Sequence, residues 1–545
     1  MTLTRRSFLK CAGIGAMSLS FGGVLSACSS GSAPKASASV TGNADEVVVS
    51  MTTSSEPAAG FDPLFSWGCG EHVHEPLIQS TLITTDKDLN FVNDLATDYS
   101  CSKDGLTWTF TIRDDVKFTD GQPLTARDVA FTINGINENA AAEADLSMVK
   151  KAVAVSDTVV ELHLNKPFNA LLYTLAVVGI VPEHAYDSAS YGANPIGSGR
   201  YMLEQWDRGQ QVILKANPDY YGEAPLMKRV IVVFMEEDAS LAAANSAQVD
   251  IAYTAATKAD ATPSNYDLLV CRTVDSRGIS LPTIAPGGTK ADGDAVYNSG
   301  NAVTQDIALR RAINYAVDRT TMVNNVLNGH GTPAYSVSDG TPWASDDMKA
   351  ETDLDRAKQI LEAGGWTRGE DGVYQKDGMC AAFDLYYSSN DSVRQALAAE
   401  FSNQMTALGV DVTIKGGGWD DLYPREFSDP VLWGWGANSP VELYNLTYST
   451  ATGNYACYES KAVDAHLDAA LAKTKVEDSY DEWKLAQWDG KNGVAPQGAA
   501  SWVWLVNVDH LYFKRTGLQV ADQKPHPHGH GWSLVNNVDR WSWEG

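Results

Sequence analysis

Residues 120–132 have the sequence DGQPLTARDVAFT and contain the start of a helix. Thr125 is suited to cap this helix, because Asp128 follows three residues later and completes a capping box. The residues after the cap fall at helical spacing: Ala126, Val129, Ala130 and Ile133. Residues 106–118, just before the motif, alternate in the manner of a strand, with one face formed by Trp108, Phe110 and Ile112. The segment therefore predicts a strand followed by a helix.

Outward from this segment, strands and helices alternate in both directions. Buried strands are expected at 47–49, 230–234 and 383–387. Helices are expected at 306–327 and 353–361, and a further helix begins after Asp391, which is its predicted cap. No internal repeat interrupts the pattern. Alternating strands and helices indicate an α/β architecture with open sheets.

The composition is that of a globular protein with several domains. The chain has 545 residues, of which 44% are hydrophobic and 20% charged, so two to four domains are expected. Its formal net charge is −27, and no dense cluster of Lys and Arg occurs. A nucleic-acid ligand is not expected, because phosphate contacts require a basic surface. Ten of the fifteen Trp residues lie from Trp419 onward, so this part of the chain is expected to line or support something.

The N-terminus has the features of an export signal. Residues 4–10 (TRRSFLK) form a twin-arginine region, residues 11–24 are apolar, and Leu25-Ser26-Ala27-Cys28 resembles a lipobox. Residues 1–27 are therefore expected to be a twin-arginine lipoprotein signal peptide, cleaved on the N-terminal side of Cys28, whose thiol is acylated. The small residues of 28–45 would form a flexible tether. This resemblance implies an extracytoplasmic protein that touches the membrane only through its lipid anchor.

Several long motifs follow one another in a family-specific order. They are DGQPLTARDVAFT at 120–132, PIGSGRY at 195–201, NPDYYG at 217–222, LRRAINYAVDR at 309–319, and the segment from Asp355 to Trp366. In this order they resemble the family 5 extracytoplasmic solute-binding proteins, the receptors of peptide, opine and nickel ABC importers. The resemblance covers nearly the whole mature chain. It is closest to the branch that binds nickel with small amino-acid chelators such as histidine.

The resemblance implies a two-lobe, periplasmic-binding-protein-like fold of type II, cluster C. The expected divisions are lobe I at 46–80, 190–275 and 490–545, an inserted subdomain at 81–189, and lobe II at 276–489. It further implies a monomer that delivers its cargo to a permease and ATPase subunits in the membrane. No permanent cofactor is expected. An enzyme is not expected either, because the sequence contains no Walker A loop, Gly-x-Ser-x-Gly elbow or His-Glu-x-x-His motif.

Residues 434–440, at the expected end of a strand, give evidence about the kind of ligand. Peptide-binding relatives carry an Asp after the Gly-Trp pair, where it meets the α-amino group of the peptide. This chain has Gly434-Trp435-Gly436-Ala437-Asn438-Ser439-Pro440, with no carboxylate before the proline. A buried ammonium group without a charged partner is costly. The sequence therefore favours a ligand other than an ordinary peptide, although a peptide importer stays the alternative.

Five of the ten histidines lie in two clusters near the ends of the chain: His72 and His74, and His526, His528 and His530. Because both ends contribute to lobe I, the two clusters are expected to converge. Imidazole is a good ligand for nickel, copper and zinc. Pro527 prevents a helix there, so the second cluster is expected in a loop. The resemblance to the nickel branch implies His530 first and His528 second as metal ligands, with His72 or His74 as a further ligand and His526 as the remaining candidate. The alternative is a solvated turn rich in histidine, or rings hydrogen-bonded to carbonyl groups.

Arg394 is the predicted partner for a carboxylate of the ligand. It lies in the first turn of the helix that Asp391 caps, just after a strand, where open α/β sheets place their ligand crevices. Trp433, Trp435 and Tyr444 are expected to line the cleft. The alternatives are a salt bridge for Arg394 and core packing for the aromatic residues. The sequence thus predicts capture of a nickel or related metal chelate, with a peptide as the alternative ligand. A third possibility is a metallohydrolase, which would need three convergent metal ligands and an open position.

Overall fold

A computed structural model describes residues 44–65, 76–139, 142, 144–293, 295–436, 438–525, 527 and 534–544. The expected signal peptide, most of the tether and Cys28 lie outside these residues. So do Cys69 and both histidine clusters. Among the described residues, Cys101, Cys271, Cys380 and Cys457 are free thiols. Within the same part of the chain, no helix combines the length and the apolar character needed to cross a bilayer.

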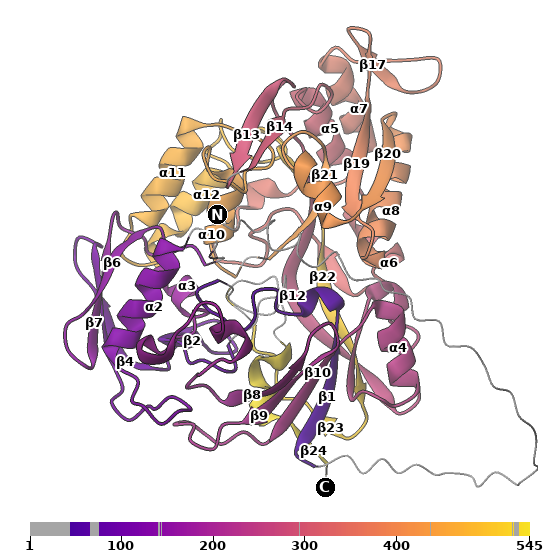
Figure 1. Cartoon of the computed structure of the whole chain (residues 1–545). Coiled ribbons are helices and arrows are strands. Elements are labelled where there is room, and N and C mark those ends of the chain that lie inside the picture. The colour runs from indigo at the N-terminus through magenta and orange to yellow at the C-terminus, as the bar shows by residue number, and fades with distance from the viewer. Residues whose placement is uncertain are drawn as a thin grey trace, which may run out of the picture.

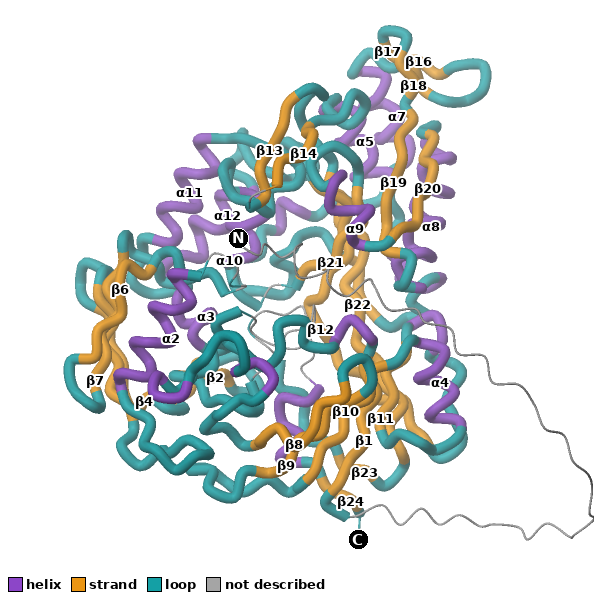
Figure 2. Tube along the Cα trace, in the orientation of Figure 1, coloured by secondary structure: helices purple, strands orange, loops and turns teal. Residues whose placement is uncertain are grey.

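One large mixed sheet runs through the centre of the molecule (Figures 1 and 2). In spatial order its main strands are β20 (Asp411–Gly417), β19 (Ala382–Ser388), β21 (Val431–Trp435), β12 (Tyr266–Ser280), β22 (Trp502–Arg515), β11 (Ile251–Thr254), β1 (Glu46–Met51), β10 (Arg229–Phe234), β9 (Gln211–Ala216) and β8 (Tyr201–Asp207). A short strand, β15 (Gly331–Pro333), also pairs with β22. The expected strands at 47–49, 230–234 and 383–387 are all present. The α/β fold is therefore confirmed.

Two long strands, β12 and β22, connect the two halves of the sheet. They pair antiparallel along most of their lengths, with irregular register between Cys271 and Asp275 and again between Arg277 and Gly278. The first half of β12 lies opposite the part of β22 that pairs with β11, whereas its second half pairs with β21. β22 thus passes through both halves. The predicted lobe boundaries, which assign all of 490–545 to lobe I, stay a prediction.

Separate hydrophobic cores stabilise the two halves. In lobe I the core forms around β1, β10 and β11, and α4 (Glu237–Asn245) packs on β11. In lobe II, α8 (Ser392–Leu408) packs on β19 and β20, next to α5 (Ile307–Ala316) and α7 (Leu354–Ala363). A small sheet extends lobe II: β16 (Thr367–Arg368), β17 (Tyr374–Lys376) and β18 (Met379–Cys380). Two further hairpins are formed by β13 (Gly288–Asp292) with β14 (Ala295–Ser299), and by β23 (Leu518–Gln519) with β24 (Ser542–Trp543).

The helix expected at 306–327 is in fact two helices. The first is α5 and the second is α6 (Arg319–Asn325). Val317 has extended backbone angles, and the side chain of Asp318 accepts a hydrogen bond from the amide of Thr321. Asp318 therefore caps a second helix. The hydrophobic periodicity of residues 306–327 had indicated one continuous helix, but the chain leaves the helical conformation just before this cap.

A four-stranded sheet forms the inserted subdomain, seen beside α2 in Figure 1. Its strands are, in spatial order, β4 (Ala96–Cys101), β5 (Thr107–Ile112), β7 (Val159–Leu164) and β6 (Val149–Ala154), and α2 (Ala126–Glu138) packs on β6 and β7. The expected strand at 106–118 is shorter in the structure. The small hairpin of β2 (Ile83–Thr85) and β3 (Phe91–Asn93) and the short helix α3 (Leu171–Leu175) complete this region.

The inserted subdomain also contacts the helices α10 (Val441–Thr447), α11 (Lys461–Leu471) and α12 (Tyr480–Gln487), which precede β22. The side-chain amide of Asn169 donates to the carbonyl of Ala470 at 3.0 Å, and Trp343 lies between the rings of Tyr173 and Tyr480. Buried residues of the subdomain and of these helices form one continuous core. The subdomain of lobe I and the helices of lobe II are therefore in direct contact.

The capping box at Thr125 is confirmed and gives a first testable prediction. The amide of Thr125 donates to Asp128 at 2.8 Å, and the hydroxyl of Thr125 accepts from the amide of Arg127. The variant Thr125→Ala is expected to lower the free energy of unfolding by about 1 kcal/mol, because the first turn loses its acceptor. Urea denaturation would measure this loss. The control Thr406→Ala, at an exposed position inside α8, should show no comparable loss; equal effects of the two variants would contradict the prediction.

Candidate functional site

Arg394 lies in the first turn of α8, as predicted, and is held there by the residue that caps the helix. Asp391 accepts a hydrogen bond from the amide of Arg394 at 2.8 Å, and its second oxygen accepts from Nη1 of the same residue at 2.7 Å. The guanidinium group lies over the ring of Trp419, 5.3 Å from its centre. Arg394 is only 8% exposed. One carboxylate thus fixes both the backbone and the side chain of this arginine.

The open edge of the Arg394 guanidinium group is chemically important. In the described part of the chain, its Nε atom is buried and has no hydrogen-bond partner. A guanidinium group can bind a carboxylate through its Nε and one Nη at the same time. Since Asp391 occupies Nη1, the opposite edge is the one that remains for a ligand. The predicted role of Arg394 as a carboxylate partner stays a prediction, and this geometry is consistent with it.

Gly434 is the residue of β21 that makes room for this arginine. A β-carbon at position 434 would lie 2.5 Å from Nη2 of Arg394 and 2.8 Å from Nη1 of Arg277. Arg277 belongs to β12, and its backbone is paired directly with Gly434. Two guanidinium groups therefore lie against the same backbone face, close to where β19 and β21 end. The carboxyl ends of parallel strands are where open α/β sheets bind ligands.

Arg277 was not among the residues predicted from sequence, although a signal for it existed. Asp275 and Arg277 are two residues apart on a strand, so their side chains share one face. In the structure Asp275 binds both terminal nitrogens of Arg277, at 2.5 and 3.2 Å, and both residues are buried. Burial alone lowers the pKa of Arg277, but the charges of Asp275 and Asp391 outweigh it, and the pKa is raised. Arg277 is therefore fully charged.

The predicted aromatic residues occupy different environments. Trp433 is buried, donates from Nε1 to the hydroxyl of Ser280 at 3.0 Å, and stacks between Trp419 and Tyr455. Trp435 is partly exposed, and its Nε1 is buried without a hydrogen-bond partner in the described residues. Arg394 is thus connected to Trp433 through Trp419, whereas Trp433 and Trp435 alternate with Gly434 along β21, so their side chains point to the strand face opposite the one that the two arginines approach. The role of Trp433 and Trp435 in lining a ligand cleft stays a prediction.

Tyr444 lies away from these residues, on α10. Its ring stacks on Tyr448, with ring centres 4.6 Å apart, and the ammonium group of Lys166 lies 6.0 Å from the ring centre. Burial, together with the neighbouring Tyr448 and Asp468, raises the pKa of Tyr444. These contacts place Tyr444 where the inserted subdomain meets α10. Its assignment to the cleft also stays a prediction.

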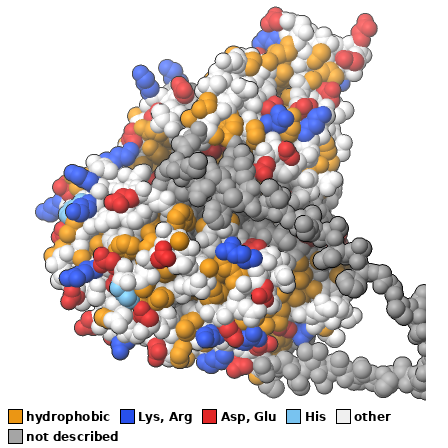
Figure 3. All heavy atoms as spheres, in the orientation of Figure 1, with side chains coloured by type: hydrophobic (Ala, Val, Ile, Leu, Met, Phe, Trp, Pro, Cys, Tyr) orange, Lys and Arg blue, Asp and Glu red, His pale blue; other side chains and the backbone are white. Residues whose placement is uncertain are grey.

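The predicted metal ligands His72, His74, His526, His528 and His530 lie outside the described residues. Among those that the structure does describe, no group of three or more His, Cys, Asp or Glu side chains is arranged to hold a metal ion. On the face drawn in Figure 3, Lys and Arg side chains are scattered among Asp and Glu, so charges of one sign do not gather into an alternative binding site there.

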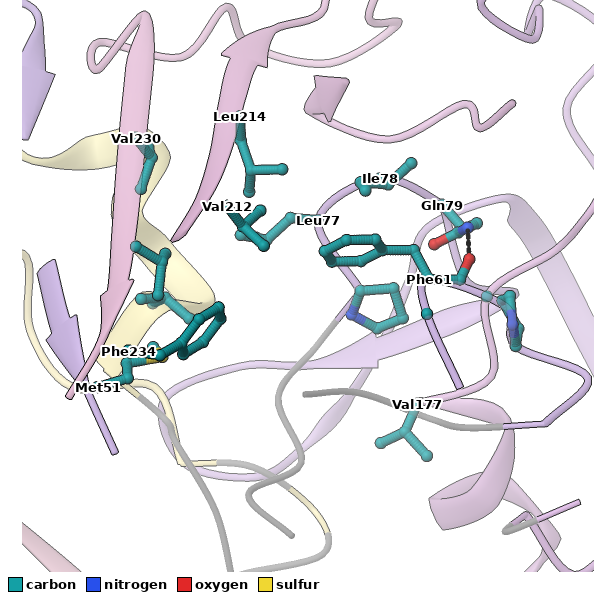
Figure 4. Close-up of a pocket in the computed structure, with 16 residues that line it drawn as sticks. Met51, Phe61, Leu77, Ile78, Gln79, Val177, Val212, Leu214, Val230 and Phe234 are labelled. Carbon is teal, nitrogen blue, oxygen red and sulfur yellow. Dashed lines mark hydrogen bonds between the residues drawn. The ribbon is translucent and has the colours of Figure 1, made fainter. Parts of the chain in front are cut away.

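A separate apolar pocket lies in lobe I (Figure 4). Its cavity of about 50 Å³ lies beside β1, β9 and β10, and its lining includes Met51, Phe61, Leu77, Val212 and Phe234. Gln79 is the polar side chain of the lining, and its amide is already bonded to the carbonyl of Phe61 at 3.0 Å. A pocket of this size and polarity does not suit a charged ligand, so the arginine pair is the better candidate site.

Comparison with known proteins identifies the family. Residues 90–456 match the model for bacterial extracellular solute-binding proteins, family 5 middle. The chain belongs to this family. Family 5 proteins are extracytoplasmic binding proteins of ABC importers and are not enzymes, so the expectations of a solute-binding protein and of no catalytic activity are confirmed.

Three individual proteins illustrate the similarity. Protein XP55 of Streptomyces lividans is 32% identical over 499 residues, which are 86% of this chain and 84% of the relative. The structure of NikZ from Campylobacter jejuni in complex with Ni(L-His) has a TM-score of 0.77 at 23% identity, covering 92% of this chain and 99% of NikZ. The structure of the oligopeptide-binding protein AppA from Bacillus subtilis, in complex with a nonapeptide, has a TM-score of 0.70 at 23% identity, with the same coverage. These two structures confirm the two-lobe family 5 fold.

Proposed function

We propose that this family 5 protein captures a nickel or related metal chelate between its two lobes and delivers it to the permease of an ABC importer. The observation that carries the proposal is the buried guanidinium group of Arg394, whose Nε has no hydrogen-bond partner among the described residues, at the end of the lobe II strands. A small chelator such as histidine bears a carboxylate that this donor suits. The similarity in fold to NikZ, which was solved with Ni(L-His), supports the same class of cargo.

The mechanism follows from two lobes joined by β12 and β22. A ligand shifts the equilibrium between open and closed forms only by its difference in affinity for them. Contacts from both lobes are therefore required: Arg394 of lobe II would hold the carboxylate, and His530 or His528 of the C-terminal segment would bind the metal. The closed form then presents one defined surface to the permease.

We also propose export by the twin-arginine route and anchoring through a lipid on Cys28. The support is the sequence itself, in which an arginine pair, a short apolar stretch and a lipobox cysteine follow in order. The tether after Cys28 would let the folded lobes move above the membrane while they stay near the permease.

The experiment begins with protein purified without an affinity tag, analysed for metals and by mass spectrometry for any small molecule released on denaturation. Titration calorimetry with nickel and L-histidine should then show binding by the natural protein and none by His528→Ala/His530→Ala, because imidazole nitrogen is a preferred nickel ligand. The matched control is His163→Ala/His184→Ala, which removes two half-exposed histidines of the inserted subdomain. Unchanged binding by the first variant would refute the proposed metal site.

A peptide is the second candidate cargo, and one observation favours it. Glu442, at the start of α10, is a buried acid two residues beyond Pro440. It places a carboxylate two residues beyond the proline, whereas the sequence before the proline offers none. Under this alternative, di- or oligopeptides would co-purify with the protein, and binding would be indifferent to metal chelators.

A further inference from the structure

Arg277 is the second cation at the point where Arg394 reaches the sheet. Nη1 of Arg277 and Nη2 of Arg394 lie 2.8 and 2.5 Å from the position that a β-carbon of residue 434 would take, so the two groups are immediate neighbours. Like charges this close repel each other, and the repulsion is stronger away from water. Such a pair persists only where anions compensate it.

A separate carboxylate balances the positive charge of each arginine. Asp391 holds Arg394, whereas Asp275 holds Arg277 and also lies 2.9 Å from Nε2 of His510 on β22. Asp275 is fully buried, and His510 is nearly so. The position of Arg277 is thus fixed through a chain of contacts that crosses from β12 to β22, at the irregular part of their pairing.

The donors of the two arginines that Asp275 and Asp391 leave unoccupied indicate that the ligand is an anion. The Nε atoms of both arginines are buried and have no hydrogen-bond partner in the part of the chain that the structure describes. Buried donors are nearly always paired, so an unpaired donor needs an explanation. An oxygen of a carboxylate is the acceptor that a guanidinium group binds best.

The pair lies where the two lobes meet. Tyr253 belongs to β11 of lobe I, yet its pKa is raised by burial and by the carboxylate of Asp391, which belongs to lobe II. The hydroxyl of Thr257, just after β11, lies 2.9 Å from that of Ser392 at the start of α8. A ligand at the arginine pair is therefore enclosed by both lobes. Because both Nε atoms are covered, it must enter while the lobes are apart.

We propose that Arg277 is a ligand-binding residue, which shares with Arg394 a single carboxylate of the cargo. Asp275 and His510 are positioning residues that hold Arg277 against Gly434. The proposal deepens the proposed function and rests on its carboxylate-bearing cargo, but it applies equally if that cargo is a peptide. The site then selects for the carboxylate itself, and ligands of the same shape without this charge are rejected.

The test removes the Asp275–Arg277 pair as a unit, with Asp275→Asn/Arg277→Met, because loss of one member alone would leave a buried charge. Four probes are titrated: nickel with L-histidine, nickel with histamine, the peptide Ala-Ala-Ala and its C-terminal amide. Histamine and the amide lack the carboxylate. The natural protein should prefer a carboxylate form by at least about tenfold, and the double variant should lose about tenfold in affinity for that form only.

Each outcome has a distinct meaning. Binding of the tripeptide with no binding of nickel and L-histidine would refute the proposed cargo while still testing Arg277. Wild-type affinity of the double variant for the carboxylate form would overturn the role of Arg277, as would an equal loss for the carboxylate-free probe. No binding of any probe would overturn both proposals.

Two further variants keep the test independent of folding. Arg277→Lys preserves the charge but lacks the Nε donor, so it should stay folded and lose part of the preference for the carboxylate form; an unchanged preference would count against the proposal. The control Asp250→Asn/Arg515→Met removes a mostly buried ion pair of lobe I, whose atoms are 3.0 Å apart. It should leave the preference unchanged, and a change would show that discrimination depends on general stability.

Discussion

The variant Arg394→Met is expected to weaken the binding of nickel with L-histidine by roughly 100-fold, or about 3 kcal/mol. Arg394 is 8% exposed, so a ligand carboxylate beside its guanidinium group is shielded from competing water. Methionine keeps much of the apolar stem but offers no charge and no donor. Titration calorimetry at constant ionic strength measures the loss directly.

The matched control for this variant is Arg425→Met. Arg425 belongs to the same lobe and also lies over an aromatic ring, that of Tyr386 at 4.6 Å, but its side chain is 45% exposed. Its removal should change affinity by less than about threefold, since exposed charge contacts contribute little. Equal affinities of the two variants would show that Arg394 does not bind the cargo. Thermal unfolding of both variants separates a lost contact from a lost fold.

The variant Gly434→Ala is expected to damage both stability and binding. Its new methyl group would lie 2.5 and 2.8 Å from the two guanidinium groups, which is too close for either to stay in place. Overpacking of this kind typically costs about 1–3 kcal/mol. Both arginines are also held by carboxylates, so their displacement would break charged contacts as well. We expect affinity for nickel with L-histidine to fall at least about tenfold, measured by calorimetry alongside the melting temperature.

A neighbouring glycine provides the comparison. At Gly418 the nearest atom to an added β-carbon is 4.0 Å away, an ordinary contact, and the backbone angles suit any residue. Gly418→Ala should therefore change stability by less than about 1 kcal/mol and leave affinity intact. If Gly434→Ala behaved in the same way, the two arginines would not be confined as the structure indicates.

The local parts of the fold and site were predictable from sequence. The capping boxes and caps depend on residues three positions apart, so the order of residues alone places Thr125 with Asp128, and Asp391 with Arg394. The continuous helix predicted at 306–327 was wrong for a local reason as well, because Asp318 caps a second helix within the periodic pattern. The hydrophobic periodicity does not show where a side-chain oxygen, such as that of Asp318, replaces a backbone carbonyl as the acceptor for an amide.

The arginine pair could not be predicted, because it depends on strand register. Arg277 and Gly434 are far apart in sequence, and only the antiparallel pairing of β12 with β21 places them opposite each other. A shift of one residue would send Arg277 to the other face of the sheet. The chain of contacts to His510 likewise depends on the irregular pairing of β12 with β22. Sequence showed the charged residues, but not which of them would meet.

The two strands that run through both halves also have an evolutionary consequence. Because β12 and β22 are interior strands of the sheet, the joint between the lobes is built largely from backbone pairing. Side chains at the mouth of the crevice can then be exchanged without redesign of the joint. A single scaffold of this kind can acquire a new cargo through few substitutions, while its mode of opening and the face it shows to the transporter are inherited unchanged.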